Sequence, residues 1–211
     1  MVARTDRSSF AAWWWTVDKA LLAGFLALMV AGFVLSFAAS PPVAERIGVE
    51  PFHFVKRHAV YLALGAAILV GGSFFSPRTV RRVALVGLLV GLGLLAATLV
   101  IGEGAKGARR WISVAGVSIQ PSEFVKPCFV IVVAWLFAEH QRRREIPGNL
   151  FAILLMVVLV GLLVAQPDFG QTILTVAAWG AMFFVAGVPM LWVTVLAALG
   201  VGGILVAYTA L

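Results

Sequence analysis

Seven long, uninterrupted apolar runs constrain this chain more than any other feature of its sequence. About 20 apolar residues are needed for a helix to cross the ~30 Å hydrocarbon core of a bilayer. The runs are Ala20–Ala39, Ala59–Phe75, Val83–Ile101, Phe124–Ala138, Leu150–Ala165, Thr172–Val188 and Met190–Leu211. Pro121 extends the fourth of these runs at its start. The sequence therefore predicts an all-α integral membrane protein with about seven transmembrane helices.

The composition excludes a soluble fold. Hydrophobic residues make up 62% of the 211 residues and charged residues 12%, against about 25% charged in a soluble domain. A chain of this size cannot bury so much apolar surface in its own core. A transmembrane β-barrel would show alternating segments of about ten residues instead of continuous runs.

The chain divides into a short tail and one membrane domain. Residues 1–18 are predicted to form a cytoplasmic N-terminal tail, and residues 19–211 a polytopic membrane domain. The first apolar run exceeds the roughly 7–15-residue core of a signal peptide, so we interpret it as a retained span. Trp13, Trp14 and Trp15 precede this run and are typical of an aromatic belt. The last run ends at Leu211 without a charged or aromatic stop, so we expect the chain to be truncated after the seventh span.

The net charge of +7 does not indicate nucleic-acid binding, because basic residues in short loops between spans set topology and contact anionic membrane lipids. With a cytoplasmic N-terminus, nine of the 16 basic residues lie inside and seven outside. This small excess has the direction of the positive-inside rule. Binding an anion, either a lipid head group or a substrate phosphate, would explain the outer cations.

No metal site, disulfide or cofactor is predicted. Cys128 is the only cysteine, and its apolar surroundings suit a small packing residue. His53, His58 and His140 show no metal-ligand spacing with one another or with Cys128. The sequence leaves the use of a divalent cation open.

The first candidate site segment runs from Gly102 to Lys126. It starts as Gly102-x-Gly104-x-x-Gly107, the spacing of a dinucleotide fingerprint. That fingerprint requires a preceding strand, whereas a membrane helix is predicted here. We interpret this start as a flexible glycine loop.

The same segment predicts a helix start with two charges in its first turns. Pro121 suits the first turn, where the helix dipole favours Glu123. Lys126 faces the same way and lies inside the apolar run. An ionisable residue within a span is a functional candidate, but a purely structural Glu123–Lys126 pair, with Lys126 snorkelling outward, fits equally well.

The second candidate segment is Gln166-Pro167-Asp168-Phe169-Gly170-Gln171. The run before it, Leu150–Ala165, has 16 residues and rises only about 24 Å as a helix. The turn is therefore expected below the outer membrane surface, where irregular backbone requires contact with protein or a water-filled cavity. Asp168 would line such a cavity. In the alternative interpretation, Asp168 caps the next helix in a simple surface turn.

Both segments fall on the outer side, so we predict a mixed-charge pocket that opens outward. Its cations suit a diphosphate, and its carboxylates would orient the cations or bind sugar hydroxyls. The predicted substrate-binding residues are Arg109, Arg110, Trp111, Gln120, Ser122, Glu123, Lys126, Asp168 and Gln171.

Two motifs resemble the SEDS family of shape, elongation, division and sporulation proteins. Residues 107–112 (GARRWI) with residues 120–126 (QPSEFVK) form the first motif, and residues 166–171 (QPDFGQ) form the second, about 40 residues later. The stretch from Ala38 to Arg57 is similar to the division-type branch, FtsW, more than to the elongation-type branch, RodA.

The resemblance implies a bundle of roughly ten membrane-spanning helices and peptidoglycan polymerisation. Family members join the sugars of lipid II, an undecaprenyl-diphosphate-linked disaccharide peptide, on the outer face of the bacterial cytoplasmic membrane. This reaction needs a base for the attacking hydroxyl and cations for the departing diphosphate. The implied partners are lipid II, a class B penicillin-binding protein transpeptidase, other division proteins and membrane lipids, and the expected location is the division septum.

In this family the catalytic aspartate lies in a long outer loop after the seventh span, so no residue of this chain is predicted to be catalytic. The 211 residues alone are therefore expected to be inactive. A lipid II flippase and a division-complex scaffold are alternatives. A flippase should carry inner-side polar residues within its spans, which the sequence lacks, and a scaffold does not need Lys126 inside a span.

Overall fold

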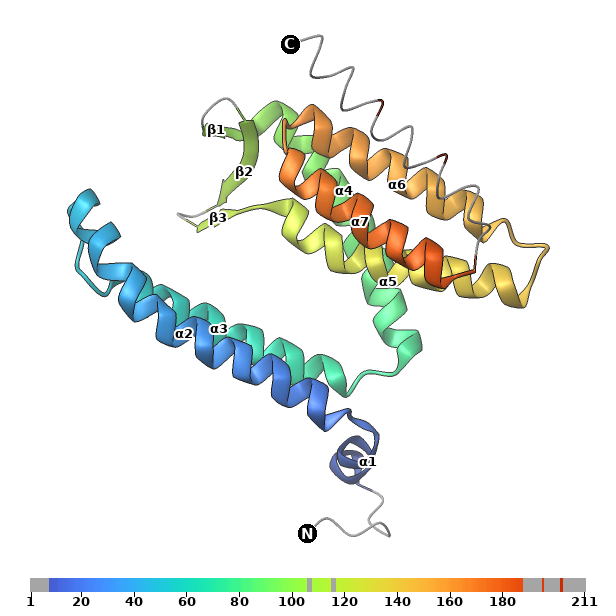
Figure 1. Cartoon of the computed structure of the whole chain (residues 1–211), viewed down its shortest axis with the longest axis horizontal. Coiled ribbons are helices and arrows are strands. Elements are labelled where there is room, and N and C mark those ends of the chain that lie inside the picture. Colours follow the sequence, from blue (N-terminus) through green and yellow to red (C-terminus); the bar gives the residue numbers. More distant parts are fainter. Residues whose placement is uncertain (1–7, 106–107, 115–116, 188–194, 196–201, 203–211) are drawn as a thin grey trace. The chain divides into compact units, whose positions relative to one another are not determined.

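The computed structural model describes residues 8–105, 108–114, 117–187, 195 and 202 (Figure 1). Apart from residues 195 and 202, the seventh predicted span lies outside the described residues. The other six predicted runs overlap helices α2 to α7. Four of them fall within their helices, whereas Ala59–Phe75 passes the end of α3 by two residues and Thr172–Val188 passes the end of α7, with residue 188 outside the described residues. Among the described helices, five are long and apolar enough to cross a membrane, and α7 is a shorter apolar helix. The predicted helical membrane fold is confirmed.

The chain forms two compact units, Met1–Val80 and Arg81–Leu211. The first contains α1 (Ser9–Thr16), α2 (Lys19–Ile47), α3 (His53–Ser73) and the start of α4 (Pro77–Ile101). The second contains the rest of α4, β1 (Glu103–Ala105), β2 (Ala108–Val114), β3 (Val117–Ile119), α5 (Pro121–Arg142), α6 (Gly148–Ala165) and α7 (Phe169–Val185).

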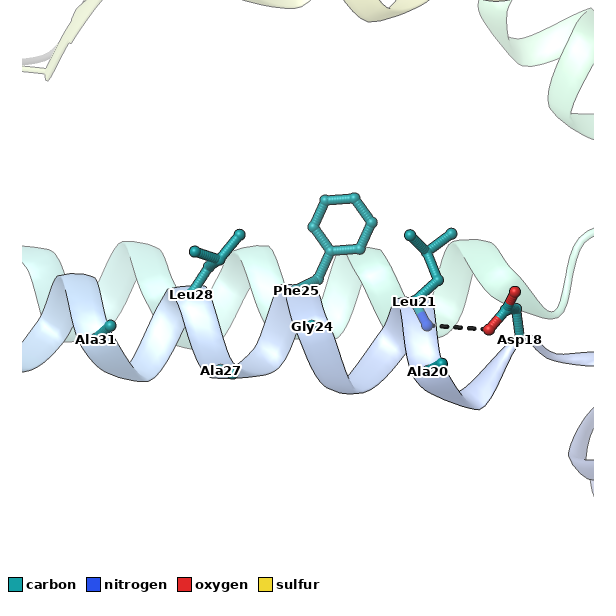
Figure 2. Close-up of a pocket in the computed structure, with 8 residues that line it drawn as sticks. All are labelled: Asp18, Ala20, Leu21, Gly24, Phe25, Ala27, Leu28 and Ala31. Atoms are coloured by element: carbon teal, nitrogen blue, oxygen red, sulfur yellow. Dashed lines mark hydrogen bonds between the residues drawn. The ribbon is translucent and has the colours of Figure 1, made fainter.

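In the first unit, α2 and α3 pair side by side as a helical hairpin (Figure 1). Asp18 caps α2 by accepting the N–H of Leu21 at 3.0 Å, and the apolar face beyond this cap is exposed, as suits contact with lipid (Figure 2). The helix continues past the predicted span end, Ala39, to Ile47. Ser40 Oγ donates to Pro51 O at 2.8 Å, which ties the far end of α2 to the segment before α3.

The predicted N-terminal tail contains the helix α1. Trp13 Nε1 donates to Ser73 Oγ at 2.7 Å, and its ring stacks on Phe74 at 4.8 Å. These contacts hold α1 against the end of α3. Lys19 lies over the rings of Trp14 and Trp15, 4.7 and 5.4 Å from their centroids, which is compatible with the predicted aromatic belt.

In the second unit, α5 packs against both α6 and α7 (Figure 1). Phe129 of α5, Leu159 of α6 and Phe183 of α7 are each no more than 2% exposed. Gly91 brings α4 close to α5, since a Cβ there would lie 2.5 Å from Val125 Cγ2. Small residues that allow close helix approach are typical of membrane bundles.

The interpretation of Gly102–Gly107 as a flexible glycine loop was wrong for Glu103–Ala105, which forms β1, whereas residues 106 and 107 lie outside the described residues. The chain forms a three-stranded antiparallel sheet in the order β1-β2-β3. Gly104 pairs with Arg109 across β1 and β2, and Ile112 pairs with Ile119 across β2 and β3. Strands of three residues are too short to show a period-2 pattern, which explains the error.

We expect Gly148→Ala to destabilise the second unit by about 1–3 kcal/mol, the usual cost of overpacking. A Cβ at Gly148, where α6 begins, would overlap the backbone carbonyl oxygen of Leu136, which cannot rotate away. Thermal unfolding in detergent would measure the effect. Gly161→Ala in the same helix is the matched control, because none of the described residues lies within 4 Å of a Cβ there. Equal unfolding temperatures for the two variants would contradict the prediction.

Candidate functional site

The strand β2 and the N-terminal ends of α5 and α7 lie at one end of the second unit (Figure 1). Side chains from these three places contact one another there. The two helix starts are adjacent because α5 and α7 pack together. We call the six side chains that meet there the polar cluster. Its members are Arg110, Gln120, Glu123, Lys126, Asp168 and Gln171.

The first half of the polar cluster is centred on Asp168, which is 4% exposed. Arg110 Nη1 lies 3.5 Å from Asp168 Oδ1, and Arg110 Nη2 donates to Pro167 O at 2.5 Å. Gln120 Nε2 approaches the other carboxylate oxygen at 3.4 Å. The Asp168 carboxylate also accepts the N–H of Gln171 at 3.4 Å. One carboxylate therefore caps α7 and fixes a cation from β2.

The second half is a closed triad of Glu123, Lys126 and Gln171. Lys126 Nζ donates to Glu123 Oε1 at 2.9 Å and to Gln171 Oε1 at 2.5 Å. Gln171 Nε2 donates to Glu123 Oε1 at 2.8 Å. The Lys126 side chain is 19% exposed, so it is largely withdrawn from the surface but still reachable.

Both sequence alternatives for these charges find support in the contacts. Glu123 and Lys126 form the expected pair in the first turns of α5, but Gln171 joins them from another helix. Asp168 caps α7, as the surface-turn interpretation predicted, and it is also buried against Arg110. The Glu123–Lys126 pair and the Asp168–Arg110 pair therefore each link two elements and do more than cap one helix.

Three predicted site residues lie outside this network. Trp111 is 39% exposed, and alternation along β2 places its side chain on the face opposite Arg110. Ser122 is 1% exposed, and its Oγ has no hydrogen-bond partner. The side chain of Arg109 lies outside the described residues. Within the part of the chain that the structure describes, no group of three His, Cys, Asp or Glu residues could hold a metal ion.

Gln166 is the residue that the sequence analysis missed. It was quoted in the second motif but not predicted to act at the site. It is 2% exposed, and its Nε2 donates to Leu95 O at 3.0 Å and to Thr98 Oγ1. The available signal was the presence of an amide and a hydroxyl near the ends of two apolar runs, where polar side chains bond across helices.

The electrostatics of the polar cluster favour an anion. Its two cations and two carboxylates balance in formal charge, but the N-terminal ends of α5 and α7 add partial positive charge. Among the residues that the structure describes, no side chain caps α5 at Gln120, and none accepts a hydrogen bond from the buried Arg110 Nε. Pro121 opens α5 without an N–H, and the N–H of Glu123 bonds Gln120 O at 3.1 Å. The preference for an anion therefore rests on the helix dipoles and on the arginine and lysine side chains, whose charged donors bind phosphate.

Comparison with known proteins places these features in a family. The family model described as "Cell cycle protein", which covers FtsW, RodA and SpoVE, matches residues 19–211. A protein from Caulobacter vibrioides named "Probable peptidoglycan glycosyltransferase FtsW" is 43% identical over 206 residues, covering 97% of this chain and 52% of the relative. A protein of the same name from Idiomarina loihiensis is 33% identical over 177 residues, covering 83% of this chain and 43% of the relative.

Two solved structures are similar to this fold. The crystal structure of the rod shape determining protein RodA from Thermus thermophilus has a TM-score of 0.66 and 29% identity, covering 88% of this chain and 60% of that one. A structure described as "Structural coordination of polymerization and crosslinking by a peptidoglycan synthase complex" has a TM-score of 0.69 and 30% identity, covering 91% and 54%. The chain spans about half the length of the curated relatives it matches. It belongs to the SEDS family of FtsW, RodA and SpoVE proteins, as its two motifs predicted, and to the division-type FtsW side of that family, as the stretch from Ala38 to Arg57 predicted.

Proposed function

We propose that the protein to which these residues belong is a peptidoglycan glycosyltransferase that polymerises lipid II during cell division, and that the polar cluster binds the diphosphate of this substrate. The observation that carries the proposal is the placement of Arg110 and Lys126 at two adjoining helix starts. The relatives' printed name supports the reaction class. The activity is assigned to the whole protein, because the chain covers about half the length of those relatives.

The reaction explains why cations are needed. A sugar hydroxyl attacks the anomeric carbon of lipid II, a base takes the hydroxyl proton, and the bond from that carbon to the diphosphate oxygen breaks. Both bonding electrons leave with undecaprenyl diphosphate, so negative charge develops on the leaving group. Fixed cations stabilise that charge more in the transition state than in the bound substrate.

Arg110 and Lys126 would divide this work by their chemistry. The planar guanidinium of Arg110 can hold two phosphate oxygens at once, whereas Lys126 acts as a point charge. The Arg110 side chain is 34% exposed and that of Lys126 is 19% exposed, so a ligand can approach both. Asp168 and Glu123 hold these cations in place before the substrate binds, which lowers the cost of ordering them.

The remaining roles come from the family resemblance. The base would be the aspartate of the long outer loop, and no residue of this chain is assigned to it. The polar cluster would face the outer side of the cytoplasmic membrane, with the N-terminus in the cytoplasm and the protein at the division septum. A class B penicillin-binding protein is the proposed partner, supported by similarity to a complex described as coordinating polymerisation and crosslinking. The proposal includes no cofactor.

We expect Lys126→Met to abolish division without preventing membrane insertion. The substitution removes one of the two cations and leaves Glu123 and Gln171 without their shared donor. Loss of one charge-stabilising donor typically slows a reaction about 10²–10³-fold. Complementation of depleted cells by the full gene, together with lipid II polymerisation by the purified whole protein, would measure the effect.

The matched control is Lys19→Met, which removes a lysine from the other compact unit. It should leave the polymerisation rate unchanged. Normal division and normal polymerisation with Lys126→Met would rule out the role of Lys126 in the reaction. Normal division together with no lipid II polymerisation by the unsubstituted whole protein would contradict the enzyme proposal and favour a scaffold.

We expect Arg110→Gln to weaken binding of undecaprenyl diphosphate about 10- to 100-fold, the range expected for a lost hydrogen bond to a charged group. Arg110→Lys should retain part of the affinity, because it keeps the charge but loses the two-pronged geometry. Binding can be measured by thermophoresis on the whole protein in detergent. Arg143→Gln is the control, because Arg143 pairs with Glu139 at the other end of α5 and its side chain is 72% exposed. Equal affinities for Arg110→Gln and the unsubstituted protein would rule out Arg110 as a ligand.

A further inference from the structure

Gln166 joins the end of α6 to a helix far away in the sequence. Its backbone N–H bonds to the carbonyls of Leu162 and Leu163 at 3.2 Å, which closes α6. Its side chain points elsewhere and reaches Leu95 of α4, 71 residues earlier. The residue is 2% exposed, so these bonds form away from competing water.

The contacts of the Gln166 carboxamide fix its orientation. A backbone carbonyl can only accept hydrogen bonds, so the amide nitrogen must face Leu95 O. The same nitrogen donates to Thr98 Oγ1, and Thr98 in turn donates to Leu95 O at 2.6 Å. Leu95 and Thr98 are both 0% exposed. The result is a closed, buried anchor between the last turns of α4 and the end of α6.

The two residues that follow this anchor hold Arg110. Pro167 supplies the carbonyl oxygen and Asp168 the carboxylate that contact its guanidinium. The N–H of Asp168 bonds back to Leu163 O at 3.0 Å. Because the turn is this short and is held at both ends, a change in the Gln166 anchor displaces both partners of Arg110 together.

We propose that Gln166 is a positioning residue of the polar cluster: through its buried bonds to α4, it holds the Pro167 carbonyl and the Asp168 carboxylate where they orient Arg110. Gln166 itself does not touch the ligand. The binding test of this role rests on the proposed function, whereas the structural test depends only on the geometry of the turn.

A purely stabilising hydrogen bond between helices would have a different signature. Polar bonds of that kind are common in membrane bundles, and removing one lowers stability without involving Arg110. The two roles are separated by a double-mutant cycle, because residues that act through one another give non-additive effects. Gln166→Leu and Arg110→Gln are the two substitutions for the cycle.

Gln166→Leu removes the carboxamide while keeping much of its volume. Leu95 O would still accept the hydroxyl of Thr98, so the substitution leaves no orphaned carbonyl. Gln141→Leu is the matched control: Gln141 Nε2 also donates to a backbone carbonyl, that of Ala186, at 2.5 Å at the other end of α5. Thr98→Val is a second test variant, which removes one of the two hydrogen-bond partners of Gln166. It replaces Gln166→Leu in the test if that variant fails to fold.

Two measurements on the whole protein in detergent test the proposal. The first is affinity for undecaprenyl diphosphate, and the second is amide hydrogen exchange across residues 168–172. Gln166→Leu should weaken binding about 3- to 20-fold, the range expected for a polar bond between membrane helices, and speed exchange in the turn. Thr98→Val should act in the same direction but less, and Gln141→Leu should change neither. In an Arg110→Gln background, Gln166→Leu should cause little further loss of affinity.

The proposal is overturned if Gln166→Leu weakens binding by the same factor in both backgrounds, or if exchange across residues 168–172 does not change. Failure of the proposed function looks different. In that case Arg110→Gln leaves the affinity for undecaprenyl diphosphate unaltered, while Gln166→Leu still accelerates exchange in the turn.

Discussion

The arrangement of the second unit around the candidate site depends on the buried carboxylate of Asp168. It starts α7 by accepting a backbone N–H, it pairs with Arg110 of β2, and it lies within reach of Gln120 just before α5. A carboxylate removed from water is costly unless its oxygens find such partners. The hydrogen-bonding requirement of Asp168 therefore brings a strand and two helix starts to the same place. Because α5 and α7 start side by side there, Glu123 and Lys126 of α5 can bond to Gln171 of α7.

This arrangement gives the site two different kinds of cation. Arg110 shares the largely buried carboxylate of Asp168, and its own side chain is 34% exposed, so an arriving anion can contact the guanidinium without displacing that carboxylate. Lys126 donates to Glu123 and Gln171, which uses two of the three N–H donors of its ammonium group, so an anion can accept from the third. In the proposed function, a multiply charged ligand would gain more at this site than a singly charged one, because charged groups interact more strongly where water is partly excluded. A diphosphate meets that condition better than a single carboxylate.

The sequence predicted the presence and order of helices α2 to α7 better than the residues at which they end. The length of an apolar run indicates which residues cross the lipid, but a helix can continue beyond them. The helix α2 therefore runs past Ala39, through two prolines, to the left-handed Gly48. The motifs identified the polar cluster by residue type and spacing. They could not reveal Gln166, whose partners are a hydroxyl and a backbone carbonyl about 70 residues away. A carbonyl has no sequence signature, so a role that depends on one becomes visible only once the helices are packed.

The anchor at Gln166 has a mechanical consequence for α4. This helix packs against α5 through Gly91 and Val125, and near its end it bonds the turn that holds Arg110's partners. The same helix then leads directly into the sheet that carries Arg110. Both sides of the Arg110–Asp168 pair are therefore tied to the end of α4, one through the chain and the other through a buried amide. Asp168 is also tied to α5, through Gln120 just before that helix and through Gln171, which accepts from Lys126. In the proposed function, the distance between the two cations decides how well they fit a diphosphate, and the packing of α4 on α5 together with these bonds contributes to that distance.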